Sequence, residues 1–407
     1  MPGPPKGSAA DPATVAWIRE RFRRYYKQIE LELPPRFTRR EFGFMLWEAG
    51  MMQRHKSFKS GESLRNFLVQ RTPMHTYYSS AYYENPGAPT MEEKGWLGAD
   101  LVFDLDADHI PGSEKMGYEE MLEAVKKRII QLYDDFLVQD FGFEEGSLRV
   151  VFSGGRGYHI HVSDERVWAL GSHERREIVD YITGKDFDFG AVFRQSVFDV
   201  KEYGGRKYDK RRVVMVDPLK AAGWQRKVVE GLQQLAKTLE PPVGIDSAVD
   251  FLSSFEGIER SDARRLWDNL FEPVAWKNRK PIRGVDRLLE TGQIEVLNDK
   301  NVRTLISVVR QLQQIRLDEH KGVSLDGVVR RGETDEPVTS DIKRLIRMPH
   351  SLHGKTGLAV VPMSRKALES FLPLRDAVPA AWTDEPTRVR LKAGIKITMR
   401  DENFNLK

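Results

Sequence analysis

Residues 148–162 read LRVVFSGGRGYHIHV, and this stretch determines much of what the rest of the chain must form. Leu148–Phe152 is apolar and rich in valine, which favours a strand, and Ser153–Gly157 contains three glycines, which favour a tight turn. In Tyr158–Val162 the two histidines alternate with apolar residues, so both imidazoles share one face of a second strand. The sequence therefore predicts two neighbouring strands joined by a turn, with one packed face and one polar face.

A helix and further strands accompany this unit. Residues 118–139 carry apolar side chains at the 3.6-residue spacing of a helix with one buried face. Leu101–Phe103 is an apolar run that leads into Asp104–Leu105–Asp106, which predicts a strand, and strand character returns at Leu358–Val361. Helical patterns dominate residues 172–317 between these strands. We therefore expect an α/β fold, more narrowly α+β, whose core is built from both ends of the chain.

The expected organisation has a short tail, a core and an inserted region. Residues 1–12, rich in proline, glycine and alanine, are expected to be a disordered tail, and a basic amphipathic helix should follow over residues 14–33. Residues 13–165 and 325–400 should form the α/β core, and residues 166–324 a mainly helical inserted region.

Composition excludes several classes of protein. The chain has 407 residues, no cysteine and a formal net charge of +4. The lack of cysteine excludes disulfides, a thiol nucleophile, an iron–sulfur cluster and any zinc site built on thiolates. With 64 basic and 60 acidic residues, the chain can bind nucleic acid only through local patches. No apolar run is long enough to cross a bilayer and no signal sequence is visible, so we expect a soluble intracellular protein without a membrane partner.

Two carboxylates stand side by side at the end of the strand that begins at Leu101. Residues i and i+2 of a strand point to the same face, so Asp104 and Asp106 project together while Leu105 packs on the other side. Two adjacent anions suit a hard divalent ion such as Mg²⁺ or Mn²⁺, which prefers oxygen ligands. Asp108 is expected in the following turn and is not counted as a ligand. From these residues alone, a solvated strand end stays open as the alternative.

The turn at residues 153–157 has the composition of a phosphate-binding loop. Its glycines let the backbone approach a ligand, and Arg156 offers a fork of N–H donors that suits phosphate oxygens. With Ser153 and His159 it forms a candidate cradle for a triphosphate. Ile160 stands where the dinucleotide-binding fingerprint needs its third glycine, which argues against that motif. The alternatives are a tight hairpin with exposed histidines and, less favoured, a zinc pair formed by the two histidines.

A third cluster lies far downstream. Asp335 precedes an Arg–Leu–Ile–Arg sequence that ends at Arg347, and His353 follows shortly after it. Gly354–Thr356 reads like the end of a Walker A loop, but Pro349 occupies the position of the first glycine, so that motif is rejected. Alone, the cluster is more typical of a charged surface loop. Together with the carboxylate pair and the cradle, it describes metal-assisted transfer to or from a polyphosphate.

Taken together, these residues resemble the small, catalytic subunit of archaeal and eukaryotic DNA primases, and most closely the archaeal form. The resemblance runs from about residue 37 to residue 362 and is densest at 93–109, 152–162 and 338–358. It implies a primase-type catalytic core with a mixed sheet flanked by helices. The implied activity is DNA-dependent nucleotidyl transfer, which makes primers de novo on single-stranded template DNA from nucleoside triphosphates. A large primase subunit as heterodimer partner and a cytoplasmic, nucleoid-associated location are implied as well.

The resemblance also assigns roles to individual residues. The family's three metal-binding catalytic aspartates are matched by Asp104, Asp106 and Asp335, which implies two Mg²⁺ or Mn²⁺ ions. Positions that contact the phosphates of the incoming nucleotide are matched by Ser153, Arg156, His159, Arg347 and His353. Glu41 and Arg54 match a region that meets the initiating nucleotide. Many relatives carry a small zinc module with cysteine ligands, which this chain cannot build, so no zinc site is predicted.

Two other functions remain open at this point. A primase-polymerase of end-joining repair shares the carboxylate pair and the cradle, although residues 344–357 have the archaeal primase form. A catalytically inactive nucleic-acid-binding subunit is the second alternative, but it would not need all three aspartates. Template contacts, unless these charges only form a solvated face, are expected at Arg206, Lys207, Lys210, Arg211 and Arg212, or else at Arg19–Lys27.

Overall fold

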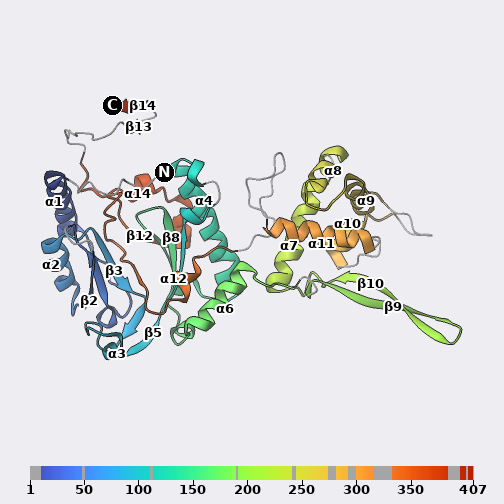
Figure 1. Cartoon of the computed structure of the whole chain (residues 1–407), viewed down its shortest axis with the longest axis horizontal. Helices are drawn as coiled ribbons and strands as arrows, with labels where there is room; N and C mark the ends of the chain where they lie inside the picture. The colour runs from blue at the N-terminus through green and yellow to red at the C-terminus, as the bar shows by residue number, and fades with distance from the viewer. Residues whose placement is uncertain are drawn as a thin grey trace.

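Two bodies make up the molecule in this computed structural model: one contains the sheets, and the other is a helical body from which a long hairpin projects (Figure 1). The described residues are 11–47, 51–110, 113–188, 191–240, 244–273, 281–291, 299–314, 332–383, 395–399 and 402–406. Within these ranges no helix is long and apolar enough to cross a membrane. The α+β class is confirmed. The paired strands of the described ranges are antiparallel, whereas we had expected a mixed sheet.

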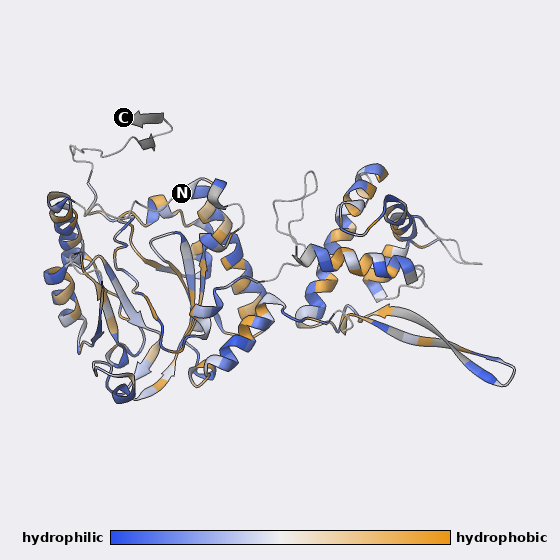
Figure 2. Cartoon of the chain, in the orientation of Figure 1, coloured by the Kyte–Doolittle hydropathy of each residue, from blue (hydrophilic) through white to orange (hydrophobic). Residues whose placement is uncertain are grey.

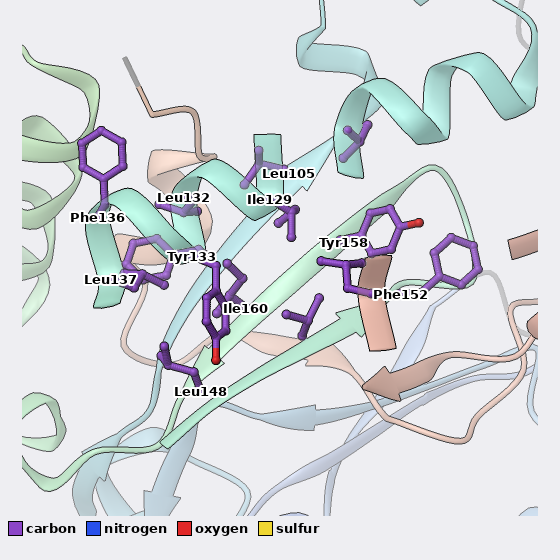
Figure 3. Packing of buried hydrophobic residues seen from close by; sticks show 14 of the residues in the cluster. Leu105, Ile129, Leu132, Tyr133, Phe136, Leu137, Leu148, Phe152, Tyr158 and Ile160 are labelled. Carbon is purple, nitrogen blue, oxygen red and sulfur yellow. The ribbon is translucent and has the colours of Figure 1, made fainter. Parts of the chain in front are cut away.

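The central sheet has the strand order β12–β7–β8–β6. Its strands are β6 (Leu101–Asp106), β7 (Leu148–Phe152), β8 (Gly157–Val162) and β12 (Val361–Met363). One face packs against α4 (Tyr118–Gln131) and the π-helical segment Leu132–Val138 that continues it. Figure 3 shows Leu105 and Ile160 in the same apolar cluster as Ile129 of the helix. Because side chains alternate along a strand, the polar residues of β6 and β8 lie on the opposite face.

A second sheet faces those polar residues. Its order is β11–β3–β1–β2, formed by β11 (Leu345–Arg347), β3 (His75–Ser79), β1 (Phe42–Met45) and β2 (Met52–Lys56). Helices α1 (Pro12–Gln28) and α2 (Gly61–Arg71) contribute to the core of this sheet, and that core also contains Val102 of β6. The Tyr78 hydroxyl lies 3.1 Å from His161 Nδ1, across the space between the two sheets. The predicted site residues of β6 and β8 therefore lie between the sheets.

Smaller elements complete the sheet-containing body. They are β4 (Ala81–Tyr83), α3 (Met91–Lys94), β5 (Trp96–Ala99), α5 (Glu165–Trp168), α6 (Ser172–Thr183), α12 (Glu336–Ser340), α13 (Arg365–Ser370) and α14 (Pro373–Asp376). A separate hairpin follows, formed by β13 (Ile395–Met399) and β14 (Glu402–Leu406) (Figure 1). Val167 of α5 and Ile182 of α6 belong to the apolar core under the central sheet. These two helices therefore pack with the core, although we had assigned them to the inserted region of residues 166–324. That division of the chain stays a prediction.

The helical body has an apolar core of its own. It consists of α7 (Gly223–Leu239), α8 (Ile245–Ser253), α9 (Arg260–Phe271), α10 (Gly284–Thr291) and α11 (Asp299–Gln314), and the hairpin is β9 (Phe193–Tyr203) with β10 (Arg206–Met215). The N-terminal end of α7 contacts the sheet-containing body. The ring centroid of Trp224 lies 5.9 Å from that of Phe136, in the π-helical segment of that body. Nearby, Lys227 Nζ lies 3.1 Å from Asp140 Oδ2.

Several expected elements differ from those observed. The helix expected over 14–33 ends at Gln28, because Ile29 turns to an extended conformation and packs against the second core. The strand expected at Leu358–Val361 begins only at Val361, because the Leu358 carbonyl instead accepts a hydrogen bond from the backbone of a preceding loop. The hairpin falls where helical patterns had been expected. Of the predicted tail, residues 1–10 lie outside the described residues, as do 325–331 and 384–394 of the predicted core.

Candidate active site

Strand β6 presents its two carboxylates toward the second sheet. Leu105 is buried in the opposite core, so Asp104 and Asp106 share a face, as predicted. In the antiparallel ladder Asp104 pairs with His159, and Asp106 pairs with Gly157. His159 Nε2 lies 3.2 Å from Asp104 Oδ1. The strand pairing thus brings the carboxylate pair and the predicted cradle together at one edge.

The chemistry of these carboxylates fits a divalent cation. Burial raises the pKa of Asp106 above its ordinary value, and the nearby carboxylates of Asp108 and Asp104 act in the same direction. The Asp108 N–H and the Arg156 guanidinium offset part of this rise. A metal ion would remove the repulsion, because it stabilises the charged form of each carboxylate. In the described part of the chain, however, no three Asp, Glu or His side chains are gathered closely enough to hold an ion.

Asp335 arrives beside β6 from far along the chain. Its backbone N–H donates to the Asp104 carbonyl oxygen over 2.9 Å. Helix α12 begins directly after Asp335, and the N–H groups of Val338 and Thr339 donate to the Asp335 carbonyl. Val338 is buried in the core of the second sheet, so α12 is fixed in place. The structure therefore anchors Asp335 next to the carboxylate pair through its backbone.

Glycines shape the turn between β7 and β8. The Ser153 N–H donates to the Gly157 carbonyl over 3.0 Å, and the Gly155 N–H donates to Ser153 Oγ over 3.3 Å. Gly154 has a φ of +74°, and a Cβ at that position would lie 2.8 Å from His353 Cβ. The turn therefore needs glycine both for its left-handed backbone and for its closeness to a neighbouring segment.

That neighbouring segment is the loop of His353. The Thr356 hydroxyl donates to the Gly154 carbonyl over 2.6 Å, which fastens the loop to the turn. His353 Nδ1 lies 3.0 Å from the Thr356 hydroxyl oxygen and 3.3 Å from the Thr356 backbone nitrogen. The other ring nitrogen, Nε2, lies over Gly155. Two clusters that the sequence presents separately thus form one polar surface.

His75 is a site residue that the sequence analysis missed. Its Nδ1 accepts from Arg347 Nη1 over 2.7 Å and from the Gly354 N–H over 3.2 Å. The rings of His75 and His353 have centroids 4.9 Å apart. His75 therefore connects Arg347 of β11 to the loop of His353. It precedes a Thr–Tyr–Tyr run that gives no sign of chemistry, and only the pairing of β3 with β11 reveals it.

Both imidazoles are held neutral. Burial lowers the pKa of His75 and of His353 to about 3, and the cations of Arg347 and Lys355 act in the same direction. Burial also lowers the pKa of Arg347, whereas the charges of the two strand aspartates oppose this change. The negative charge of Asp104 and Asp106 therefore stabilises the Arg347 cation.

Arg156, in the turn before β8, and His159, on β8 itself, complete the cradle. Arg156 is exposed and pairs with Asp108, and its Nε lies 3.9 Å from Asp106 Oδ1. His159 is buried, and within the described residues its Nδ1 has no hydrogen-bond partner. A buried polar atom without a partner is costly, so the position of His159 carries a local energetic cost.

Glu41 and Arg54 form a separate ion-pair cluster. Glu41 precedes β1 and is buried, and it accepts from Arg54 Nε over 3.1 Å and from the His55 N–H over 3.0 Å. Lys94 Nζ lies 2.5 Å from the same carboxylate. Burial raises the pKa of Glu41, but the hydrogen bonds from Arg54 and Lys94 outweigh this effect and hold the pKa below its ordinary value.

Comparison with known proteins identifies the family of this chain. The model of the DNA primase small subunit family matches residues 103–365. The DNA primase small subunit PriS of Methanocella arvoryzae is 40% identical over 400 residues, which are 97% of this chain and 93% of that protein. The PriS proteins of Methanococcoides burtonii and Halobacterium salinarum are 37% and 38% identical over 97% of this chain, and over 93% and 92% of their own lengths.

The fold and the site define an enzyme that transfers nucleotides. The chain belongs to the DNA primase small subunit family, and the resemblance to the archaeal form is confirmed. The function of a catalytic primase subunit in DNA replication follows from this membership, which does not favour the end-joining enzyme or the inactive subunit. The family implies, in general terms, a metal-dependent reaction with a DNA template and nucleotide substrates.

Proposed function

We propose that this chain joins nucleotides into primers on single-stranded DNA as a nucleotidyltransferase of the DNA-directed RNA polymerase type. The observation that carries the proposal is the meeting of three distant segments. These are β6 with its two aspartates, the turn at residues 153–157 and the loop at residues 353–358. Carboxylates on one side and N–H donors on the other are what the joining of a triphosphate to a hydroxyl requires.

The carboxylates would hold the metal ions. Asp104, Asp106 and Asp335 supply oxygen donors that suit two Mg²⁺ or Mn²⁺ ions. When bound, such ions lower the pKa of the attacking 3′-hydroxyl and stabilise the pyrophosphate that leaves. His159 restrains the Asp104 carboxylate from 3.2 Å, and its own position on β8 is fixed by burial.

The donors would bind the triphosphate. Arg347 brings the charge, and His75 orients its guanidinium through the 2.7 Å hydrogen bond. Neutral His353 places its Nε2 next to Ser153 and the glycine turn, where it can form a hydrogen bond with a phosphate group. Arg156, which pairs with Asp108, would exchange that partner for a phosphate oxygen. Donors fixed before the reaction stabilise charge where it develops without reorganising.

The remaining assignments rest on the family. Glu41 and Arg54 are proposed to meet the initiating nucleotide, and Arg54 is exposed enough to reach a ligand while Glu41 anchors it. A large primase subunit is proposed as the heterodimer partner, and a cytoplasmic, nucleoid-associated location is proposed because a primer is made on the chromosome. The absence of a zinc site stays a prediction, since residues 111–112 of the stretch His109–Met116 lie outside the described residues.

Synthesis on a circular single strand without any primer tests this function. We expect the wild-type protein, supplied with the large subunit and Mg²⁺ or Mn²⁺, to make primers de novo. Asp335→Asn should lose this synthesis while keeping its melting temperature, whereas Glu336→Gln, which changes the neighbouring exposed carboxylate, should keep it. Wild-type protein that extends broken ends but never starts a chain would contradict the proposal, and so would full activity of Asp335→Asn.

A further inference from the structure

The β9–β10 hairpin is an arm whose base, the pair of Phe193 and Met215, packs in the core of the helical body. Its ladder runs from the pair Phe193–Met215 to the pair Tyr203–Arg206. Gly204 and Gly205 close it with φ values of +58° and +73°, as a two-residue turn with two left-handed positions requires. At about 3.3 Å per residue, strands of this length reach roughly 30 Å. Figure 1 shows the hairpin projecting from the helical body, away from the sheets.

This arm concentrates positive charge. Residues 193–215 contain seven Lys or Arg and three Asp or Glu, a net charge of +4. The whole chain also has a net charge of +4, so the rest of the sequence is balanced. Figure 2 shows hydrophilic residues gathered at the outer end of the hairpin. The excess positive charge of the chain is therefore equal to the charge of this one segment.

The outer end also exposes an aromatic ring between cations. Lys201 and Tyr203 are two residues apart on β9, and Arg206 pairs with Tyr203 in the ladder, so the three share one face. All three are exposed, and Tyr203 is 65% exposed. Val200, on the opposite face of β9, is 50% exposed. Cations that flank an open aromatic ring are suited to a polyanion with flat bases or sugars.

The other basic segment has fewer cations available. Helix α1 buries Phe22 and Tyr26 in the core of the second sheet. Arg21 is buried and donates to the Ala381 carbonyl, and Arg23 pairs with Glu20 over 2.6 Å. Arg19–Lys27 is therefore partly occupied in holding α1, which favours the hairpin as the binding surface.

We propose that the β9–β10 hairpin is an arm that binds the phosphate backbone of the duplex formed by template and primer. The proposal rests on the proposed function, since it names the surface that holds the nucleic acid of that reaction. A template–primer hybrid is A-form, and its wide, shallow minor groove exposes sugars and the flanking phosphates to a two-stranded ribbon that lies along it. Lys201 and Arg206 contact phosphates on the face of Tyr203, which packs on a sugar or base. Lys207, which pairs with Glu202 on the opposite face, contacts a phosphate from that side.

The position of the arm determines which step it affects. The arm belongs to the helical body, whereas the aspartates of β6 belong to the sheet-containing body (Figure 1). The arm therefore holds nucleic acid away from the proposed site of nucleotidyl transfer. Loss of its charge should weaken binding of the duplex and leave the turnover number at saturating template unchanged. Arg347 and His353, in contrast, should act on the KM for the nucleotide.

Salt dependence of binding tests the arm directly. The variant Lys201→Gln/Arg206→Gln/Lys207→Gln removes three exposed charges and no packing. Each phosphate contact contributes about 0.9 to the slope of log K against log salt, so three contacts should flatten the slope by about 2 to 3. Binding is measured by fluorescence anisotropy of a labelled template–primer duplex, without nucleotide or metal. Melting temperatures should match the wild type.

A matched control separates contact from overall charge. Arg260→Gln/Arg264→Gln/Arg265→Gln removes the same charge from the exposed surface of α9 and should leave the slope unchanged. Equal flattening in both variants would overturn the proposal, as would an unchanged slope in the hairpin variant. A loss confined to single-stranded template would also overturn it. Loss of large-subunit binding with an unchanged slope would assign the hairpin to a protein partner instead.

The test is independent of catalysis. Asp335→Asn should bind the duplex with the wild-type slope, because it leaves the arm intact. If the proposed reaction were wrong, primer synthesis would fail while the arm still bound the duplex. If the hairpin did not bind the duplex, the hairpin variant would still make primers at low template concentration, with the wild-type KM for template.

Discussion

Gly157 is the point where the fold and the site depend on the same atoms. It pairs with Asp106 in the β6–β8 ladder, and a methyl group there would overlap the Leu105 carbonyl oxygen and lie 2.9 Å from Asp106 Cα. Both neighbours are backbone atoms of β6, which cannot rotate away. Gly157→Ala should therefore push β6 and β8 apart at Asp106, which we propose as a metal-binding carboxylate.

The size of this effect follows from the contact. Ordinary van der Waals contact for a Cβ begins at 3.4 Å, so the Asp106 backbone must move by at least about half an ångström. Overpacking of this kind typically costs about 1–3 kcal/mol of folding free energy. Misplacement of a reacting group by about 1 Å costs on the order of 10²-fold in rate, so a fall in kcat of roughly tenfold or more is expected.

Urea unfolding and initial rates of primer synthesis measure the two effects in parallel. Gly146→Ala is the matched control, because a methyl group at Gly146 meets no atom within 4 Å. We expect the control to keep both stability and rate. If Gly157→Ala also keeps both, the close pairing of Gly157 with Asp106 is wrong, and with it the geometry of the carboxylate pair.

Three further outcomes are expected. His75→Ala should raise the KM for the nucleoside triphosphate several-fold with little change in kcat, because Arg347 loses the hydrogen-bond acceptor that orients it. If steady-state kinetics show an unchanged KM, His75 does not belong to the nucleotide site. The pKa values of His75 and His353 are about 3 in the folded protein and near 6.5 in the unfolded chain. Between these values the unfolded chain binds more protons than the folded protein. The free energy of unfolding should therefore fall as the pH drops from about 6.5 to 3. Urea unfolding across this range should show a shallower fall in His75→Gln/His353→Gln, and equal falls would contradict the assignment. Asp100→Ala should cost about 3–5 kcal/mol in urea unfolding, because it leaves the buried Arg40 cation unpaired, and a loss below about 1 kcal/mol would show that water reaches that pair.

The strands of the site were predictable because local signals suffice for them. Alternation fixes which face of β6 carries Asp104 and Asp106, and three glycines between two apolar runs fix the turn before His159. The π-helical end of the helix begun at Tyr118 was not predictable, because a segment of seven residues holds too few apolar positions to reveal a change of period.

Contacts between distant segments could not be read from the sequence. His75 has no motif around it, and only the pairing of β3 with β11 places it beside Arg347. The backbone bond from Asp335 to Asp104 likewise depends on how α12 packs. The hairpin was missed although Gly204–Gly205 is a strong turn signal, because the charged residues on both sides of it obscure the alternation of a strand.

The central claim is that the carboxylates of β6 hold the ions of a nucleotidyl transfer, and one comparison tests it most directly. Initial rates of primer synthesis in Mg²⁺ or Mn²⁺ should be measured for Asp106→Asn and for Asp108→Asn, which makes the same change two residues away in the exposed turn. We expect Asp106→Asn to fall by about 10³-fold or more, since bound metal contributes several kcal/mol to such reactions, and Asp108→Asn to stay within about tenfold of the wild type. Equal rates for Asp106→Asn and the wild type would contradict the account.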